Sequence, residues 1–312
     1  MTKTNIVWSW AARLLVGLAL VLLCAWGAAL WYFNRPVEPP TRAQSQVAFE
    51  RAVSWFKANE QTVLQDSNSA LWLMIDHAAR IKQDAYLGGL VQRHLALVYP
   101  QNNAAQDIWH RIVAPDGAAG RYTASERDGW DPYQRFLAYA LTCDGSLSAD
   151  PDVAAHLSPQ ACRPMHRKVW AGDPVCSTHQ AVGLMLMQRE RCGDQAAVST
   201  VLDEVVADID EQLHWDVVVR DAYLQRVLLL MWHADSASAA KPIWLVRVLR
   251  AQSADGGWSP RRQMPEWPAW LQPSLVRDFA ARWRPGLAAH AGNASDFHAS
   301  AQGLLITALA SR

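Results

Sequence analysis

Two histidines and two tyrosines, side chains that can transfer protons, occur at the starts of apolar segments of this chain. They are His179, Tyr133, Tyr223 and His298, and Asp, Gln or Arg residues stand close to each of them. A histidine or tyrosine can abstract and return a proton while a neighbouring Arg or Gln side chain stabilises developing negative charge. β-Elimination on a uronate or hydrolysis of a glycan requires this chemistry. We therefore take these four as candidate catalytic residues.

Polar residues near these positions are candidates for holding a ligand. The ligand-binding candidates are Asp131, Arg135, Gln180, Asp221 and Arg226. They also have structural interpretations, because Asp131, Thr178 and Asp221 are suitable helix N-caps, and Arg135 and Arg226 could pair with aspartates. The histidines and tyrosines could equally be interior side chains with satisfied hydrogen bonds. An enzyme and a non-catalytic binding protein therefore both remain open.

Four similar helices must position these residues. Each begins with a polar turn and then becomes apolar on nearly all sides, which is typical of a buried helix. The four are Asp131–Thr142, Thr178–Arg189, Asp221–His233 and His298–Ala310, and they start 47, 43 and 77 residues apart. Such spacing fits one inner and one outer helix in each repeating unit. It predicts parallel inner helices whose polar first turns meet at one mouth.

Helical periodicity continues through the rest of the domain. Asn68–Ile81 carries apolar residues at i, i+3, i+4 and i+7 after a capping Asn or Ser. Further helices are predicted at Asp84–Val98, Val201–Leu213 and Ile243–Ala251. The fold class is therefore all-α, arranged either as an α/α toroid, here an incomplete ring of helical hairpins, or as an irregular helical bundle.

One turn of the chain carries a family resemblance. Gln252-Ser-Ala-Asp-Gly-Gly-Trp258 resembles the QW-type signature of the terpenoid cyclase and prenyltransferase α/α-toroid superfamily. The resemblance implies an outer helix that ends in this turn and an inner helix that follows it. It implies no reaction, because Asp208-Ile-Asp-Glu211 is only faintly similar to the cyclase acid motif and is predicted on a solvated helix face. Trp258 could pack over a helix end or stack on a sugar, so we add it to the ligand-binding candidates.

An uncharged segment near the amino terminus predicts a membrane anchor. Leu14–Phe33 is long enough to cross the roughly 30 Å hydrocarbon core of a bilayer. Lys3 and Arg13 precede it, and the positive-inside bias keeps residues 1–13 in the cytoplasm. The alternative is a cleaved signal peptide, but the apolar run is longer than signal peptides carry and ends without a small-residue cleavage site. We predict a single-pass protein of the bacterial inner membrane, with a proline-containing linker at 34–46 and a periplasmic helical domain at 47–312.

Five cysteines are present, and Cys24 lies in the predicted span. The other four are Cys143, Cys162, Cys176 and Cys192, an even number that favours disulfides in an oxidising compartment. A helix between Cys176 and Cys192 would hold them roughly 24 Å apart, too far for a bridge. We therefore predict Cys143–Cys192 and Cys162–Cys176. A zinc site is the competing interpretation, although no CxxC or HxxxH spacing supports it.

Composition limits the remaining function classes. The chain has 29 Lys and Arg residues against 29 Asp and Glu residues, so no nucleic-acid surface is indicated. No cofactor or metal motif is present, and we expect neither. We predict a membrane-anchored periplasmic protein that binds an envelope ligand or partner, such as a glycan or an envelope protein. The alternative is an envelope glycan lyase or hydrolase that uses the His, Tyr and Arg residues at the mouth.

Overall fold

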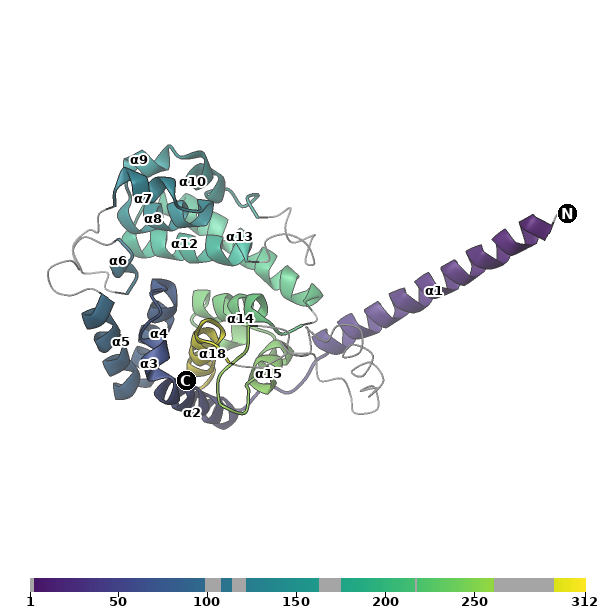
Figure 1. The fold of residues 1–312 in the computed structure, drawn as a ribbon, viewed down its shortest axis with the longest axis horizontal. Helices are drawn as coiled ribbons and strands as arrows, with labels where there is room; N and C mark the ends of the chain where they lie inside the picture. The colour runs from purple at the N-terminus through teal and green to yellow at the C-terminus, as the bar shows by residue number, and fades with distance from the viewer. Residues whose placement is uncertain (1–2, 99–107, 114–121, 163–174, 217, 261–294) are drawn as a thin grey trace.

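The computed structural model describes residues 3–98, 108–113, 122–162, 175–216, 218–260 and 295–312 (Figure 1). Within these ranges the chain is helical and forms no strand, apart from a single bridge between Trp258 and Asp296. The helices are α1 (Lys3–Asn34), α2 (Arg42–Ala58), α3 (Glu60–Val63), α4 (Ser69–Lys82), α5 (Ala85–Val98), α6 (His110–Val113), α7 (Ala124–Asp128), α8 (Pro132–Thr142), α9 (Gly145–Ser148), α10 (Pro151–His156), α12 (Cys176–Glu190), α13 (Gln195–Trp215), α14 (Asp221–His233), the 3₁₀ turn η1 (Ala237–Ala239), α15 (Pro242–Arg250) and α18 (Phe297–Ala310). The all-α prediction is confirmed.

Each helix predicted from periodicity is present, and only α12 and α13 have a boundary that differs by more than one residue from the prediction. Helix α13 starts at Gln195, six residues before the predicted Val201, because Asp194 caps it there. Helix α12 starts at Cys176. Helix α2 begins at Arg42, inside the segment predicted as linker, because Thr41 and Gln44 form a capping box. The segment after α1 therefore ends at Thr41.

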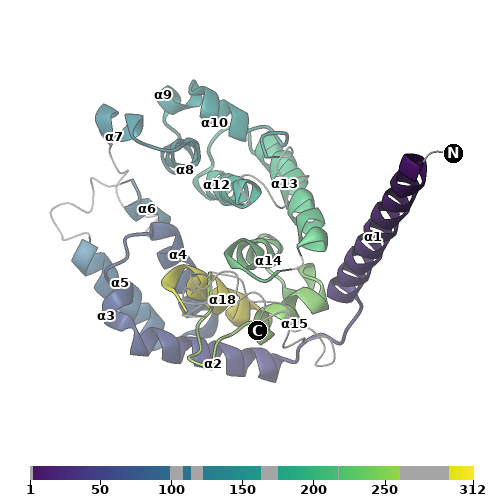
Figure 2. The same ribbon diagram turned by 45° about the vertical axis from the view of Figure 1, so that its right-hand side comes forward.

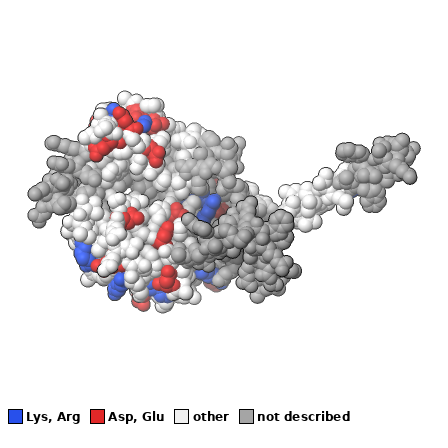
Figure 3. Space-filling view, viewed as in Figure 1, with Lys and Arg blue, Asp and Glu red and all other residues white. Residues whose placement is uncertain are grey.

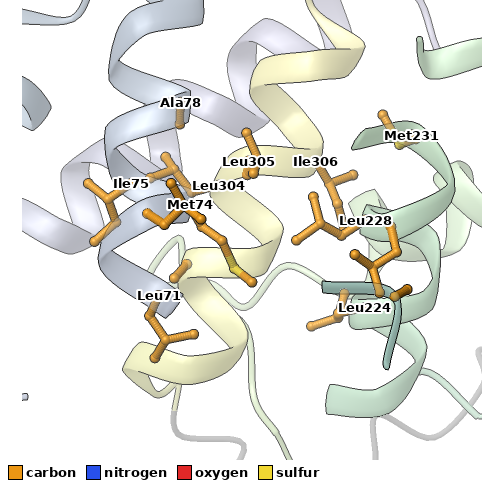
Figure 4. Close-up of a cluster of buried hydrophobic side chains, with 14 of the residues drawn as sticks. Leu71, Met74, Ile75, Ala78, Leu224, Leu228, Met231, Leu304, Leu305 and Ile306 are labelled. Atoms are coloured by element: carbon orange, nitrogen blue, oxygen red, sulfur yellow. The ribbon is translucent and has the colours of Figure 1, made fainter. Parts of the chain in front are cut away.

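Five helices, α8, α12, α14, α18 and α4, form a row in which each contacts the next (Figure 2). The starts of α14 and α18 lie together, since Asp221 of α14 contacts His298 of α18. The ends of α4 and α18 lie together, since Lys82, the last residue of α4, donates to Ser311 after α18. In Figure 4, Leu71 and Leu224 lie toward one end of the close-up and Ala78 and Met231 toward the other, so α4 and α14 run in the same direction. Helices α4, α14 and α18 therefore run in parallel, and for α14 and α18 this agrees with the sequence prediction.

A second set of helices covers the outside of this row. Helix α13 contacts both α12 and α14, while α15 packs on α14, α2 on α18, and α5 on α4. Helix α13 buries Val198, Leu202, Val205, Ile209 and Leu213, which follow one another at intervals of three or four residues. Helix α18, in contrast, is buried on every side from Ala299 to Leu309. The sequence difference between one-sided and all-round apolar helices thus corresponds to outer and inner positions.

Two disulfides close the region around α8 and α12. Cys143 and Cys192 follow the C-terminal ends of these helices, and their Cα atoms lie 5.2 Å apart. Cys162 and Cys176 have Cα atoms 5.6 Å apart. Both predicted pairings are confirmed.

Helix α1 contains the one segment of the described chain that is long and apolar enough to cross a membrane, Ala12–Asn34. Its last two residues are held by the domain. Phe33 is buried beneath the Arg247 guanidinium, 4.6 Å from the ring centre. Asn34 donates to the His214 carbonyl at 2.8 Å and accepts from the Trp244 indole at 3.3 Å. The segment after α1, predicted as a spacer, therefore does not separate α1 from the domain, because α13 and α15 contact the helix end directly.

Candidate functional site

Asp221 joins the first turns of two inner helices. One of its carboxylate oxygens accepts from His298 Nδ1 at 2.5 Å and from Gln302 Nε2 at 2.9 Å. The other accepts from Gln225 Nε2 at 3.0 Å. Gln225 in turn accepts from the Thr178 hydroxyl of α12 at 2.6 Å. We call Asp221, His298, Gln302, Gln225 and Thr178 the mouth network, and it links α12, α14 and α18.

The charge on His298 is controlled by the acidic groups around it. Burial alone would lower the pKa of His298, but its hydrogen bond to Asp221 and the negative charges of Asp221, Asp296 and Asp66 outweigh burial and raise this pKa. Burial also raises the pKa of Asp296, assisted by the charges of Asp221 and Asp66 and opposed by its hydrogen bond from Ala299 and by His298. A protonated His298 is thus favoured at the centre of an acidic cluster.

We expect stability to fall as His298 loses its proton. Because the folded-state pKa is raised, the stabilisation is fully present below about pH 6.5, the ordinary histidine value, and is lost as the pH rises through the folded-state pKa. NMR titration of the imidazole should give a pKa above the ordinary value. His298→Gln should remove this part of the pH dependence of the thermal midpoint. His233→Gln, which breaks the exposed pair with Asp203, should retain it. An imidazole pKa of His298 at or below the ordinary value would contradict the prediction.

A second pair of candidate residues meets between α8 and α12. The rings of Tyr133 and His179 are stacked, with centroids 4.5 Å apart and planes inclined by 22°. Both side chains are half-buried. The first turns of α8 and α12 therefore present an aromatic surface, as the first turns of α14 and α18 present a hydrogen-bonding one.

The capping interpretation holds for one of its three residues. Asp131 is the N-cap of α8 in a capping box with Gln134. Asp221 is already the first residue of α14, and its carboxylate bonds to other side chains. Thr178 lies inside α12 and donates to the Val175 carbonyl as well as to Gln225. Capping does not account for Thr178 or Asp221, because both carry side-chain bonds between helices.

Tyr223 and Arg226 belong to a separate buried cluster. Arg226 forms an ion pair with Asp216 at 2.6 Å and donates to Gln212 at 2.9 Å. The Tyr223 hydroxyl accepts from Arg247 at 3.1 Å, and its ring is completely buried. Burial raises the pKa of Tyr223, so its hydroxyl stays protonated. The structure therefore keeps this candidate catalytic tyrosine apart from the mouth network.

Two other ligand-binding candidates are occupied by neighbouring protein groups. The Gln180 amide is fully buried and donates to the carbonyls of His156 and Ser158, both at 2.8 Å. Arg135 pairs with Asp150 and Asp152 beside α10. Both side chains connect an inner helix to the segment around α10.

Trp258 has a structural position in the turn that carries the family resemblance. It is completely buried, and its indole donates to the Val248 carbonyl near the end of α15 at 2.9 Å. A Cβ atom at Gly303 would lie 2.4 Å from the Trp258 ring, so α18 passes directly against it. The Gln252 amide donates to the carbonyls of Ala48 and Gly256. Of the two roles considered for Trp258, the structure supports packing at the helix end.

Sequence reasoning missed three polar residues that the structure brings together. Gln302 completes the mouth network, and Asp216 and Arg247 complete the buried cluster. All three lie in or beside helices that were predicted, but no spacing within one helix identifies a partner from another. A second missed feature lies at the opposite ends of the inner helices, where basic residues in their last turns were a signal.

No group of three or more His, Cys, Asp or Glu side chains in the described ranges has the arrangement of a metal site. Comparison of the chain with protein-family models, curated proteins and solved structures finds no match.

Proposed function

We propose that this protein is held in a bacterial inner membrane by α1 and binds a hydroxyl-rich envelope ligand, such as a glycan, at the first turns of its inner helices. The observation that carries this proposal is the convergence of Asp221, His298 and Gln302 from two helices. Carboxylate, imidazole and amide groups together donate to and accept from sugar hydroxyls. The stacked Tyr133 and His179 add an aromatic surface for the apolar face of a sugar ring.

The fold that we propose for this function is an incomplete α/α toroid. Support comes from the row of parallel inner helices and from the outer helices that alternate with them along the chain. The turn from Gln252 to Trp258 supports the resemblance to the terpenoid cyclase and prenyltransferase superfamily, since it leads from outer helix α15 toward inner helix α18.

Acidic side chains are visible near the middle of the face drawn in Figure 3, where they could accept hydrogen bonds from a ligand.

The periplasmic location makes a topological prediction. A reporter phosphatase that needs its own disulfides should be active when fused after Arg312, because the basic flank keeps the amino terminus inside and the two disulfides favour an oxidising compartment. A fluorescent protein that folds only in the cytoplasm should be dark at the same position. Activity of the cytoplasmic reporter alone would contradict export of the domain.

Ligand binding can be tested with glycan strands released from purified cell-wall sacculi. Isothermal titration of the full-length protein in nanodiscs should show binding, and Asp221→Asn should weaken it by at least tenfold because the acceptor for His298 and Gln302 changes. Asp203→Asn is the matched control, since Asp203 also faces a histidine, His233, but on the exposed surface of α13. Equal affinity of Asp221→Asn and Asp203→Asn would reject the mouth network as the site.

One observation favours the second candidate, a glycan lyase or hydrolase. The His298–Asp221 contact of 2.5 Å resembles the pairing of a general acid or base with the carboxylate that orients it. Tyr133 and His179 could then hold the sugar, whereas buried Tyr223 would not take part. If the protein is such an enzyme, incubation should shorten the strands, and His298→Gln should stop this while His233→Gln does not. Strands of unchanged length would leave binding as the function.

A further inference from the structure

A cavity of about 510 Å³ lies at the opposite ends of the inner helices from the mouth network. Its apolar wall includes Leu73 of α4, Val182 and Met185 of α12, and Trp232 of α14. This volume lies within the range of small-molecule sites, and such sites combine an apolar lining with a few polar groups. The cavity shares no residue with the mouth network, so the inference below does not rest on the proposed function.

Arginine side chains form the polar part of the cavity lining. Arg80 lies in the last turn of α4, Arg189 lies in the last turn of α12, and Arg312 follows α18. Arg80 pairs with Asp76, and Arg312 pairs with Asp235 at 2.5 Å. These two ion pairs each balance one positive charge.

Arg189, the third arginine of the lining, shares its carboxylate partner with Arg111, so one positive charge near the cavity is not balanced. Glu190 accepts from Arg189 Nε at 2.9 Å and pairs with Arg111 at 2.6 Å, so one carboxylate faces two guanidinium groups. Two further nitrogens of Arg189 donate to the backbone carbonyls of Ile112 and Arg111, both at 2.8 Å. These bonds fix the Arg189 guanidinium in position at the cavity, as a preorganised anion site requires.

His77 supplies a polar atom without a protein partner. It lines the cavity and stacks on Trp232 with ring centroids 5.4 Å apart. Its buried Nε2 has no hydrogen-bond partner within the described ranges. Burial lowers the pKa of His77, and the positive charges of Arg80 and Arg312 lower it further against the opposing effect of Asp235. The neutral imidazole can therefore bond to a ligand head group, and the surrounding field is positive.

We propose that this cavity binds an amphipathic monoanion with an aliphatic tail, in the manner of a long-chain fatty acid. The tail lies against Leu73, Val182, Met185 and Trp232, where its burial supplies the hydrophobic free energy. The carboxylate lies among the arginines at the helix ends, and His77 bonds to it. A neutral or cationic amphiphile of equal length lacks the charge that this end of the cavity complements.

The test uses the full-length protein in phosphatidylcholine nanodiscs and a diazirine derivative of palmitate. After irradiation, mass spectrometry of peptides should locate cross-links in α4 and α12. Excess palmitate should suppress these cross-links by about tenfold, because it competes for the same site by mass action. Equal amounts of hexadecanol or hexadecyltrimethylammonium should leave them unchanged. Cross-links confined to α1 would show partition into the bilayer only and would overturn the proposal.

Two pairs of variants separate filling of the cavity from loss of charge. Val182→Trp should abolish cross-linking in α4, while Val47→Trp, on the exposed surface of α2, should not. Arg80→Gln should weaken it several-fold, whereas Arg93→Gln, which breaks a similar surface pair with Glu60 on another face, should have no effect. Because Arg80 is exposed, its variant tests the proposal even where Val182→Trp does not fold. Labelling unchanged by Arg80→Gln would reject the anion site, and Asp221→Asn should leave all labelling intact.

Discussion

Replacing Gly256 with alanine should lower the free energy of unfolding by on the order of 3–5 kcal/mol, because the new side chain meets both strain and a clash. Gly256 has a φ of +96°, a conformation that disfavours any residue with a Cβ atom. A Cβ atom there would also lie 2.2 Å from the backbone oxygen of Arg51 in α2. Backbone atoms inside a helix cannot move away as a flexible side chain can. Thermal or urea unfolding measures the loss.

Gly88→Ala provides the control for this variant. Gly88 lies within α5, and a Cβ atom there would have no neighbour within 4 Å. Alanine is the better helix former, so this change should be neutral or stabilising by up to about 1 kcal/mol. A similar loss of stability in both variants would show that the close contact between Gly256 and α2 is not the cause.

Replacing Arg226 with methionine should cost about 3–5 kcal/mol, because it leaves the carboxylate of Asp216 buried without its main partner. The Arg226 and Asp216 side chains are 2% and 3% exposed, so water cannot replace the lost ion pair. Arg220, at 3.9 Å from the same carboxylate, offers only a distant substitute. Chemical denaturation of the full-length protein would measure the change.

Two comparisons test this explanation of the Arg226 effect. The double variant Arg226→Met with Asp216→Leu should recover part of the stability, since it removes the buried charge as well. Arg93→Met, which breaks the exposed pair with Glu60, should cost no more than about 1 kcal/mol. If the double variant is as unstable as the two single losses added together, an uncompensated charge is not the source of the effect.

The helices could be predicted from the sequence because the spacing of buried apolar residues is set within each helix and does not depend on its partners. The all-round apolar character of His298–Ala310 predicted an inner helix, and α18 is buried on every side. The start of α2 was missed because Thr41 and Gln44 follow three prolines, whose composition suggested a linker. Cysteine pairing could be ranked because helix length excluded Cys176 with Cys192.

The site was harder to predict because its partners come from different helices. Asp221 was selected correctly as a polar residue at a helix start, but capping and bonding between helices have the same sequence signature. Tyr223 is two residues further along α14 and therefore on its opposite side, where Arg247 binds it. Both positions match the pattern, and only the packing of α18 and α15 separates their roles. The cavity beside Trp232 could not be predicted from the sequence for the same reason, since its lining depends on how α4, α12 and α14 pack together.

The contacts of Phe33 and Asn34 with α13 and α15 have a mechanical consequence. A domain attached to its membrane helix through a flexible linker can turn in any direction relative to the membrane. Here the end of α1 is clamped, so in a membrane the domain would tilt and rotate only together with the helix that carries it. The directions that the domain can face would then be set by the tilt of α1 in the lipid.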